Sequence, residues 1–114
     1  MPKANTLFLN LLETRALWII AQKPLHGYAI LKELNRNRKR KTTNGTLYPI
    51  LQKLQRLKLV QLKSKGAREK KTYSITAKGR KTLGEACKEL CIAFESIFQD
   101  FVCRTCGARV ERKR

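Results

Sequence analysis

Apolar residues recur at helical spacing in four segments of this chain, and at alternate positions in one stretch before the last segment. Spacings of three and four residues predict helices at residues 7–21, 27–36, 42–58 and 77–102. Alternating residues at 59–63 and 71–76 predict a β-hairpin with a basic tip. A chain of 114 residues with this order of elements has room for one small domain and a short appendage.

The apolar positions also predict which face of each helix is buried. The first helix buries Leu9, Leu12, Ala16, Leu17 and Ile20, the second buries Tyr28, Ile30, Leu31 and Leu34, and the third buries Leu47, Ile50, Leu51, Leu54 and Leu57. Pro24 ends the first helix, and Pro49 is expected to kink the first turns of the third. Thr42 or Thr43 is expected to cap the third helix, and Thr76 the fourth.

Positive charge is concentrated in the middle of the chain. The net charge is +18, and residues 36–80 contain fifteen Lys and Arg residues against one acidic residue, Glu69. Residues 1–35 and 81–111 are close to neutral. A basic surface segregated in this way favours a polyanionic partner, and it points to nucleic acid.

Several functional classes are disfavoured. No apolar run approaches the ~18 residues of a membrane span, and the N-terminus has no signal-peptide pattern, so we expect a cytoplasmic protein that does not bind membranes. One histidine and eight scattered carboxylates offer no set of nucleophile, base and orienting group. We therefore expect no enzymatic activity and no cofactor.

The fourth predicted helix carries a heptad seam. Intervals of four and three residues separate Leu83, Cys87, Leu90, Phe94, Ile97 and Phe101. Such a seam on a terminal helix usually faces another helix, most simply its twin in a homodimer. We predict a mainly α fold with a small β-hairpin wing: a winged helix-turn-helix DNA-binding domain at 1–80, a dimerisation helix at 81–102 and a basic, cysteine-containing tail at 103–114. In such modules the third helix enters the major groove and the hairpin lies along the DNA backbone.

Three short stretches carry a family resemblance. They are PLHGY at residues 24–28, GTLYPIL at 45–51 and YSITAKG at 73–79. In order and spacing they resemble signature stretches of the PadR family of transcriptional regulators, over about residues 7–100. The resemblance implies a homodimeric regulator of double-stranded DNA, usually a repressor, of the small subfamily that dimerises through one C-terminal helix. It also implies a small-molecule effector that weakens DNA binding, whose chemistry varies among members.

The expected DNA contacts lie in the third helix, the loop before it and the wing. Thr43, Asn44 and Thr46 have short polar side chains on the first turn, suited to phosphates or base edges, and the helix N-terminus itself favours a phosphate. The resemblance favours a phosphate contact for Tyr48, the alternative being a core aromatic. The expected electrostatic contacts are Lys39, Arg40, Lys41, Lys53, Arg68, Lys70 and Lys71.

Two single-copy residues have alternative interpretations. His26 is the only histidine, and its turn lies in the first family motif, which favours a structural role over catalysis or pH sensing. Trp18 is the only tryptophan, and it either stacks on a planar effector or, as is more usual on an amphipathic helix, packs in the core.

The four cysteines fall into two pairs. Cys87 and Cys91 lie one turn apart on the fourth helix and are expected as small buried residues, whereas Cys103 and Cys106, followed by Gly107, resemble half of a zinc knuckle. A helix running to residue 102 would separate the pairs by about 18 Å, too far to share an ion within one chain, although an antiparallel partner could supply the second pair.

We therefore predict no metal site, and three interpretations of Cys103 and Cys106 stay open: zinc ligands, a reversible disulfide favoured by Arg104 and Arg109, or an inert tail. The sequence as a whole predicts a sequence-specific DNA-binding regulator, most simply a homodimeric repressor relieved by a small ligand. The alternatives are an architectural protein that binds DNA of any sequence, and a regulator whose cysteines sense metal or redox state.

Overall fold

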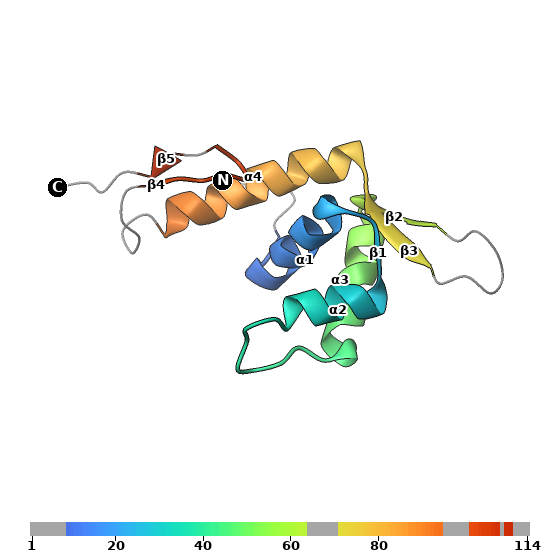
Figure 1. The fold of residues 1–114 in the computed structure, drawn as a ribbon. Coiled ribbons are helices and arrows are strands. Elements are labelled where there is room, and N and C mark those ends of the chain that lie inside the picture. Colours follow the sequence, from blue (N-terminus) through green and yellow to red (C-terminus); the bar gives the residue numbers. More distant parts are fainter. Residues whose placement is uncertain (1–8, 64–70, 95–100, 108, 111–114) are drawn as a thin grey trace.

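Helices α1 to α3 pack around a small core, with a β-sheet on one side and a longer helix lying across the top (Figure 1). The computed structural model describes residues 9–63, 71–94, 101–107 and 109–110. The helices are α1 (Leu11–Gln22), α2 (Gly27–Leu34), α3 (Asn44–Arg56) and α4 (Ala77–Ala93). Strands β1 (Leu25–His26), β2 (Val60–Lys63) and β3 (Thr72–Ile75) form an antiparallel sheet in the order β1-β3-β2, and β4 (Phe101–Val102) pairs with β5 (Arg109–Val110).

These elements confirm the mainly α fold with a small wing. In the wing, Val60 lies opposite Ile75 and Lys63 opposite Thr72, which is the predicted hairpin. Thr76 caps α4 as expected, whereas Thr43 takes the N-cap position of α3 but its side chain makes no capping hydrogen bond. α3 is continuous through Pro49.

The start of α1 is fixed by a capping box. The side chain of Asn10 accepts a hydrogen bond from the backbone N–H of Glu13 at 2.8 Å, and the Glu13 carboxylate accepts one from the backbone N–H of Asn10 at 3.0 Å. Two otherwise unpaired backbone donors are satisfied in this way, so the helix begins at Leu11 rather than at residue 7.

The core is built mainly from the apolar faces of α1, α2 and α3, and Leu59, Val60 and Leu83 complete it. The largest fully buried side chains are Leu17, Ile20, Ile30, Leu34, Leu47, Leu54 and Leu59. Two aromatic residues depart from the expectation, because Tyr28 is 68% exposed and Trp18 is 41% exposed. Both can present an apolar ring and a polar end to the surface, so helical spacing alone does not decide their burial.

The wing is joined to α4 by a close approach of two backbones. Thr76 donates its N–H to the carbonyl oxygen of Leu59 at 3.0 Å, and its hydroxyl caps the N–H of Gly79 at 2.9 Å. A Cβ atom at Gly79 would overlap that same Leu59 carbonyl oxygen and lie 2.7 Å from Ile75 Cγ1. Only glycine fits here, which explains its place in the third family motif.

The predicted extent of the fourth helix is wrong. α4 ends at Ala93, and Phe101 and Val102 form strand β4 instead of continuing the helix. The sequence has no Gly or Pro between residues 85 and 106, so it contains no stop signal, and apolar spacing by itself does not mark a helix end. Of the predicted seam, Leu83 is buried in the core, Phe101 lies on β4 and Ile97 lies outside the described residues.

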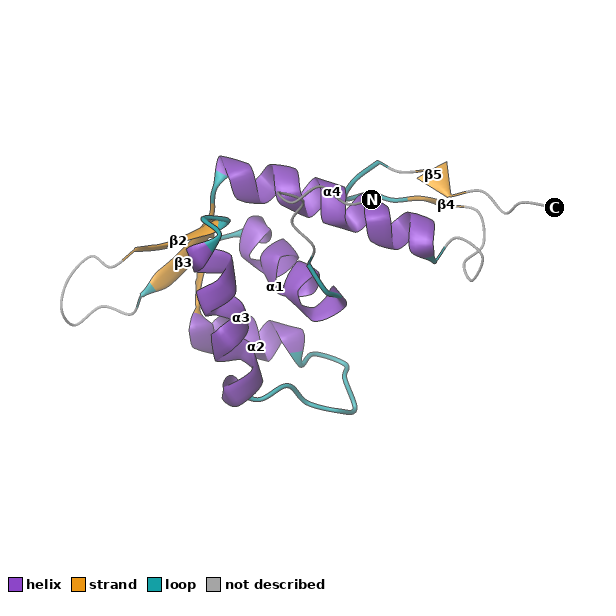
Figure 2. Ribbon diagram, turned by 180° about the vertical axis from the view of Figure 1, so that it is seen from behind, coloured by secondary structure: helices purple, strands orange, loops and turns teal. Residues whose placement is uncertain are grey.

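The early end of α4 also overturns the distance argued for the cysteines. The chain returns along the helix, so that β4, β5 and the turn between them lie beside the C-terminal half of α4 in both ribbon views (Figure 2). Cys103 and Cys106 thereby come next to Cys87 and Cys91. No helix among the described residues is long and apolar enough to cross a membrane.

Candidate nucleic-acid interface

The start of α3 is positioned by the residue that ends α2. Asn35, the C-cap of α2, accepts the backbone N–H of Thr42 through its Oδ1 atom at 2.7 Å and donates its Nδ2 to the carbonyl of Thr42 at 2.9 Å. These two bonds close the basic loop at its base. They fix the point at which the chain enters α3 relative to α2, which defines the helix-turn-helix.

The first turn of α3 is exposed and its N-cap side chain is not used for capping. Asn10, His26 and Thr76 each accept a backbone N–H at the start of their helices, whereas Thr43 makes no such bond. Thr43, Asn44 and Thr46 are all exposed, as predicted for DNA contacts. A helix N-terminus of this kind is a suitable partner for an anionic oxygen.

A hollow of about 560 Å³ lies between α2, α3 and the wing. Its lining includes Tyr28 from α2, Asn44 and Tyr48 from α3, and Lys71 and Tyr73 from the wing. Tyr48 is 61% exposed, which excludes the core alternative for this side chain. The sequence reasoning missed Tyr28 because it assigned this residue to the apolar stripe of α2, and the only signal for it was its place in the first family motif.

The pKa of Tyr73, which lines this hollow, is shifted by its surroundings. Burial, and in second place the neighbouring Tyr48, raises the pKa of the Tyr73 phenol. The Tyr73 phenol therefore stays neutral to a higher pH than an ordinary tyrosine does.

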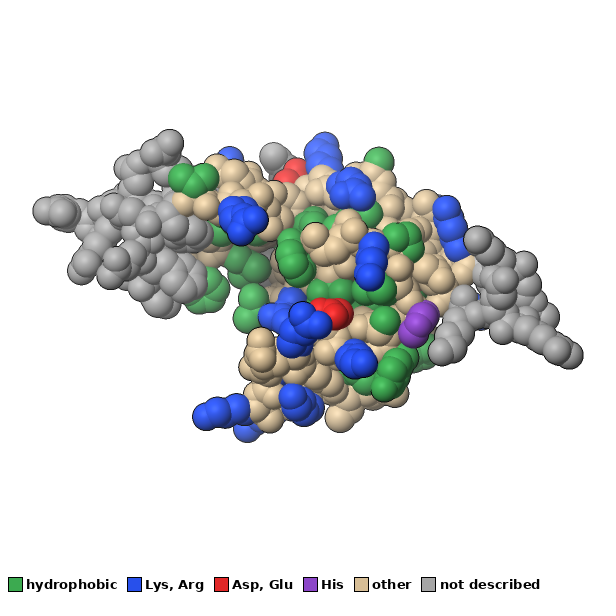
Figure 3. All heavy atoms as spheres, in the orientation of Figure 1, with side chains coloured by type: hydrophobic (Ala, Val, Ile, Leu, Met, Phe, Trp, Pro, Cys, Tyr) green, Lys and Arg blue, Asp and Glu red, His purple; other side chains and the backbone are tan. Residues whose placement is uncertain are grey.

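The predicted basic contacts flank this surface. Lys39, Arg40 and Lys41 are exposed in the loop between α2 and α3, and Figure 3 shows Lys and Arg side chains at the end of the molecule where this loop lies. Lys41 also donates to the carbonyl oxygen of Asn35 at 2.9 Å. Lys71 is exposed directly before β3, and Arg68 and Lys70 lie outside the described residues.

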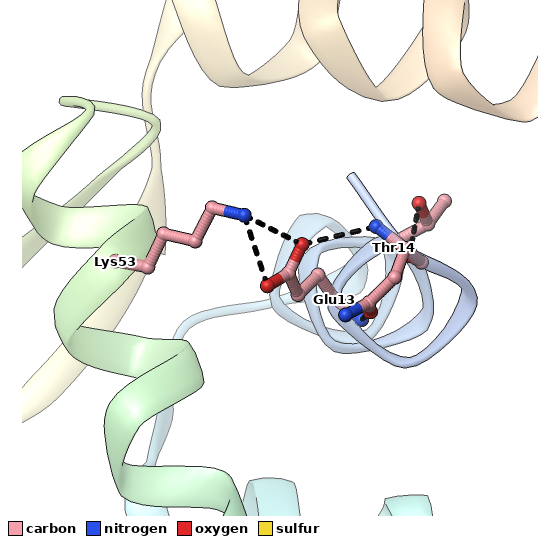
Figure 4. A network of polar contacts seen from close by, with 4 residues as sticks. Glu13, Thr14 and Lys53 are labelled. Carbon is pink, nitrogen blue, oxygen red and sulfur yellow. Dashed lines mark hydrogen bonds and ion pairs between the residues drawn. The ribbon is translucent and has the colours of Figure 1, made fainter. Parts of the chain in front are cut away.

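Lys53 has a partner inside the protein. Its Nζ atom lies 3.0 and 3.1 Å from the two carboxylate oxygens of Glu13, which is almost buried at 9% side-chain exposure (Figure 4). The pair joins α3 to the first turn of α1. Because the charge of Lys53 is compensated there, we leave it out of the interface proposed below.

His26 has the structural position favoured by the sequence. It is the N-cap of α2, and its Nδ1 atom accepts the backbone N–H of Ala29 at 3.4 Å. Its backbone also belongs to β1, which pairs with the wing strand β3. The residue thus connects the wing to the start of α2.

The comparisons with known proteins agree with this geometry. The model of the PadR-like family of transcriptional regulators matches residues 16–85, which include α2, α3 and the wing. The chain belongs to this family. Since PadR-like regulators act by binding DNA and are not enzymes, the chain is a DNA-binding transcriptional regulator.

Solved structures show the same family fold. A PadR-like transcriptional regulator from Bacillus cereus is 29% identical, with a TM-score of 0.69 over 76% of this chain and 87% of that one. A PadR-like transcription factor from Bacteroides fragilis is 28% identical, with a TM-score of 0.60 over 77% and 90% of the two chains. None of the curated proteins compared with the chain matches it.

The PadR match includes the candidate interface but not the cysteines. Tyr28, Asn44, Tyr48 and Lys71 lie within residues 16–85, whereas Cys87 and the three cysteines after it follow the match. The cysteine cluster is therefore a feature that the family assignment does not account for.

Proposed function

We propose that the protein is a homodimeric repressor that binds a specific DNA operator through α3 and the wing. The observation that carries this proposal is the exposed surface shared by α2, α3 and β3, on which Tyr28, Asn44, Tyr48 and Lys71 line one hollow. A winged helix places its third helix in the major groove and its wing along the backbone, so these residues are suitably placed for both.

Each group has a role that follows from its chemistry. Asn44 and Thr46, on the exposed first turn of α3, are suited to base edges and phosphates, and the uncapped helix N-terminus is suited to a phosphate. The hydroxyl groups of Tyr28 and Tyr48 are suited to backbone phosphates. Lys39, Arg40 and Lys41 on one side, with Lys71 and the wing on the other, supply the electrostatic part of the affinity.

The C-terminal half of α4 supports dimerisation. This half extends away from the body formed by α1, α2 and α3 (Figure 1), and it carries the half-buried Leu90 and the exposed Phe94. Leu83 is buried in the core, so we propose that the dimer contact lies farther along α4, with Leu90 at its centre. Membership in the PadR family favours repression, and a DNA partner favours a cytoplasmic location.

A second hollow supports control by a small molecule. It has a volume of about 660 Å³ and is lined by Trp18 and Gln22 of α1, Arg80 and Leu83 of α4, and Arg104 and Thr105 of the cysteine-containing turn. An indole ring and two guanidinium groups suit a planar anion. We propose this hollow as the effector site, and titration with aromatic carboxylates, followed by the fluorescence of Trp18, tests it.

Fluorescence anisotropy tests the proposed function. The full-length protein is titrated onto the duplex upstream of its own gene and onto a scrambled duplex of equal length, between ~50 and ~300 mM salt, where phosphate contacts weaken steeply. We expect a preference for the first duplex that persists at high salt. The proposal would be contradicted if the protein bound the upstream duplex, other promoter DNA and the scrambled duplex with equal affinity, and if all of this binding disappeared with salt. That result would favour the architectural alternative.

A further inference from the structure

All four cysteines of the chain converge at one place. Cys87 and Cys91 lie one turn apart on α4, and Cys103 and Cys106 lie on the turn after β4. All four sulfur atoms lie within 4.8 Å of one another, and the sulfurs of Cys87 and Cys103 are 3.6 Å apart. The pair on α4 and the pair on the turn, which are separated by 12 residues in the sequence, thus form one cluster of sulfur atoms.

These distances are those of a tetrahedral metal site. Zn²⁺ in a four-cysteine site has Zn–S bonds of about 2.3 Å, which places neighbouring sulfurs about 3.8 Å apart. The 3.6 Å between the sulfurs of Cys87 and Cys103 is close to this value, and the 4.8 Å limit for all four sulfurs exceeds it by only about 1 Å. A disulfide would need two sulfurs at about 2.05 Å, far closer than the 3.6 Å between Cys87 and Cys103.

The turn that carries Cys103 and Cys106 has the local structure of a metal knuckle. Gly107 has a positive φ of 76°, and its N–H donates to the carbonyl of Cys103 at 2.8 Å, which closes the turn. A non-glycine residue would be strained in this conformation, and this explains the glycine directly after Cys106. The closed turn points both sulfurs toward α4.

Hydrogen bonds also act on the Cys103 thiol. Burial raises its pKa, but the backbone N–H groups of Cys106 and Thr105, together with the thiols of Cys87 and Cys91, outweigh burial and lower the pKa to about 7. For Cys87 and Cys91, burial and then hydrogen bonding to the opposite pair raise the pKa. A divalent cation would stabilise all four thiolates, and their protons would pass to solvent as the ion binds.

We propose that Cys87, Cys91, Cys103 and Cys106 together bind one Zn²⁺ ion in a structural site that fastens the C-terminal hairpin to α4. Four protein ligands leave no open position for a substrate, which is typical of structural rather than catalytic zinc. The ion would link Cys91 on α4 to Cys103, which is 12 residues later in the sequence. It would thereby hold the chain in place after the end of α4, which no local signal in the sequence specifies.

A hydrogen bond connects the turn that carries Cys103 and Cys106 to helix α1. Trp18 of α1 donates its Nε1–H to the hydroxyl of Thr105, between the two cysteines of the turn, at 3.2 Å. Trp18, Arg104 and Thr105 also line the 660 Å³ hollow. Zinc would therefore fix one wall of that hollow against α1.

Metal analysis of the reduced, full-length protein tests the proposal. We expect one zinc atom per chain after dialysis against metal-free buffer, and we expect Co²⁺ in place of zinc to give the visible absorption of a tetrahedral tetrathiolate. Cys91→Ser and Cys103→Ser should each lose stoichiometric metal. Arg104→Ala, in the same turn but with no ligand removed, is the matched control and should keep it.

Several results would overturn the proposal. Metal analysis would do so if the chain took up no zinc from a stoichiometric supply, or if it contained iron instead of zinc. Mass spectrometry would do so if it showed disulfides in reducing buffer. Full zinc binding by Cys91→Ser would also overturn it. Because a cysteine variant could fail to fold, a second measurement uses the native chain. Removing zinc with a chelator should change the emission of Trp18 while the helical circular dichroism is largely kept, and unchanged emission after loss of zinc would exclude the fastening role.

Discussion

The ammonium group of Lys53 on α3 binds both carboxylate oxygens of Glu13 on α1, at 3.0 and 3.1 Å. The same carboxylate closes the capping box at the start of α1. One buried carboxylate therefore couples the position of α3 to the beginning of α1. This relationship distinguishes Lys53, which supports α3 from inside the protein, from the exposed residues that are proposed to contact DNA.

We expect Lys53→Met to destabilise the fold without weakening DNA binding by the folded protein. Loss of the cation leaves Glu13 buried with an uncompensated charge, and since Lys53 is one-third exposed we expect a loss of about 1–3 kcal/mol. Thermal unfolding and anisotropy measure the two effects. Lys71→Ala, the matched change at the interface, should instead leave stability unchanged and reduce the salt slope of affinity by about one. The reverse pattern would show that Lys53 is the DNA contact.

Two glycines of α4 should respond to alanine in opposite directions. At Gly79 the new Cβ overlaps the Leu59 carbonyl oxygen, so Gly79→Ala should lower the free energy of unfolding by about 1–3 kcal/mol. At Gly84 the Cβ meets nothing within 4 Å, so Gly84→Ala should stabilise the helix by roughly 0.5–1 kcal/mol. Denaturant unfolding of both variants checks this. Equal effects would mean that the wing does not pack on α4 as described.

The tyrosine pair predicts a pH dependence. Because the folded-state pKa of Tyr73 is raised above its ordinary value of 10.0, its contribution to stability is fully present below pH 10.0 and is lost as pH rises above it. Tyr48→Phe should bring the pKa of Tyr73 partly back toward 10.0, since burial remains, and should weaken DNA binding by roughly 1 kcal/mol. Alkaline absorbance titration and anisotropy measure the two. An unchanged titration would mean that the two rings are not neighbours.

A pair of substitutions on opposite faces of α4 tests the dimer. Leu90→Glu should yield monomers in light scattering and lose operator binding, because a carboxylate would be buried in the proposed contact. Ile92→Glu makes the same chemical change two residues away, on the opposite face, at an exposed position, and should leave the dimer intact. Circular dichroism confirms folding in both cases. A dimer that survives the first change and not the second would reverse the assigned face.

Local patterns were sufficient for most of the fold. The apolar spacing identified the buried faces of α1, α2 and α3, and period-two alternation identified the wing, because burial of one face is encoded in consecutive residues. Thr43, Asn44, Thr46, Tyr48 and Lys71 were all found exposed, as a DNA interface requires. Their contacts with DNA stay predictions.

Features that depend on contacts between distant residues could not be predicted from local patterns. The internal partner of Lys53, the exposure of Tyr28 and the contact of Trp18 with Thr105 all depend on residues that come close only after packing. No spacing rule contains them, because a lysine on a polar helix face looks the same in sequence whether it faces solvent or a carboxylate 40 residues away.

The sequence by itself determined the family, the winged-helix fold and the basic character of the central segment, since these follow from local periodicity, short motifs and charge. Only the tertiary structure decided where α4 ends and what the cysteines can do. A helix that ended eight or nine residues later would keep the two pairs far apart. Because the chain instead returns along α4, the sulfur atoms of all four cysteines lie within 4.8 Å of one another. Metal binding depends on the distances between sulfur atoms and not on the spacing of cysteines in the sequence.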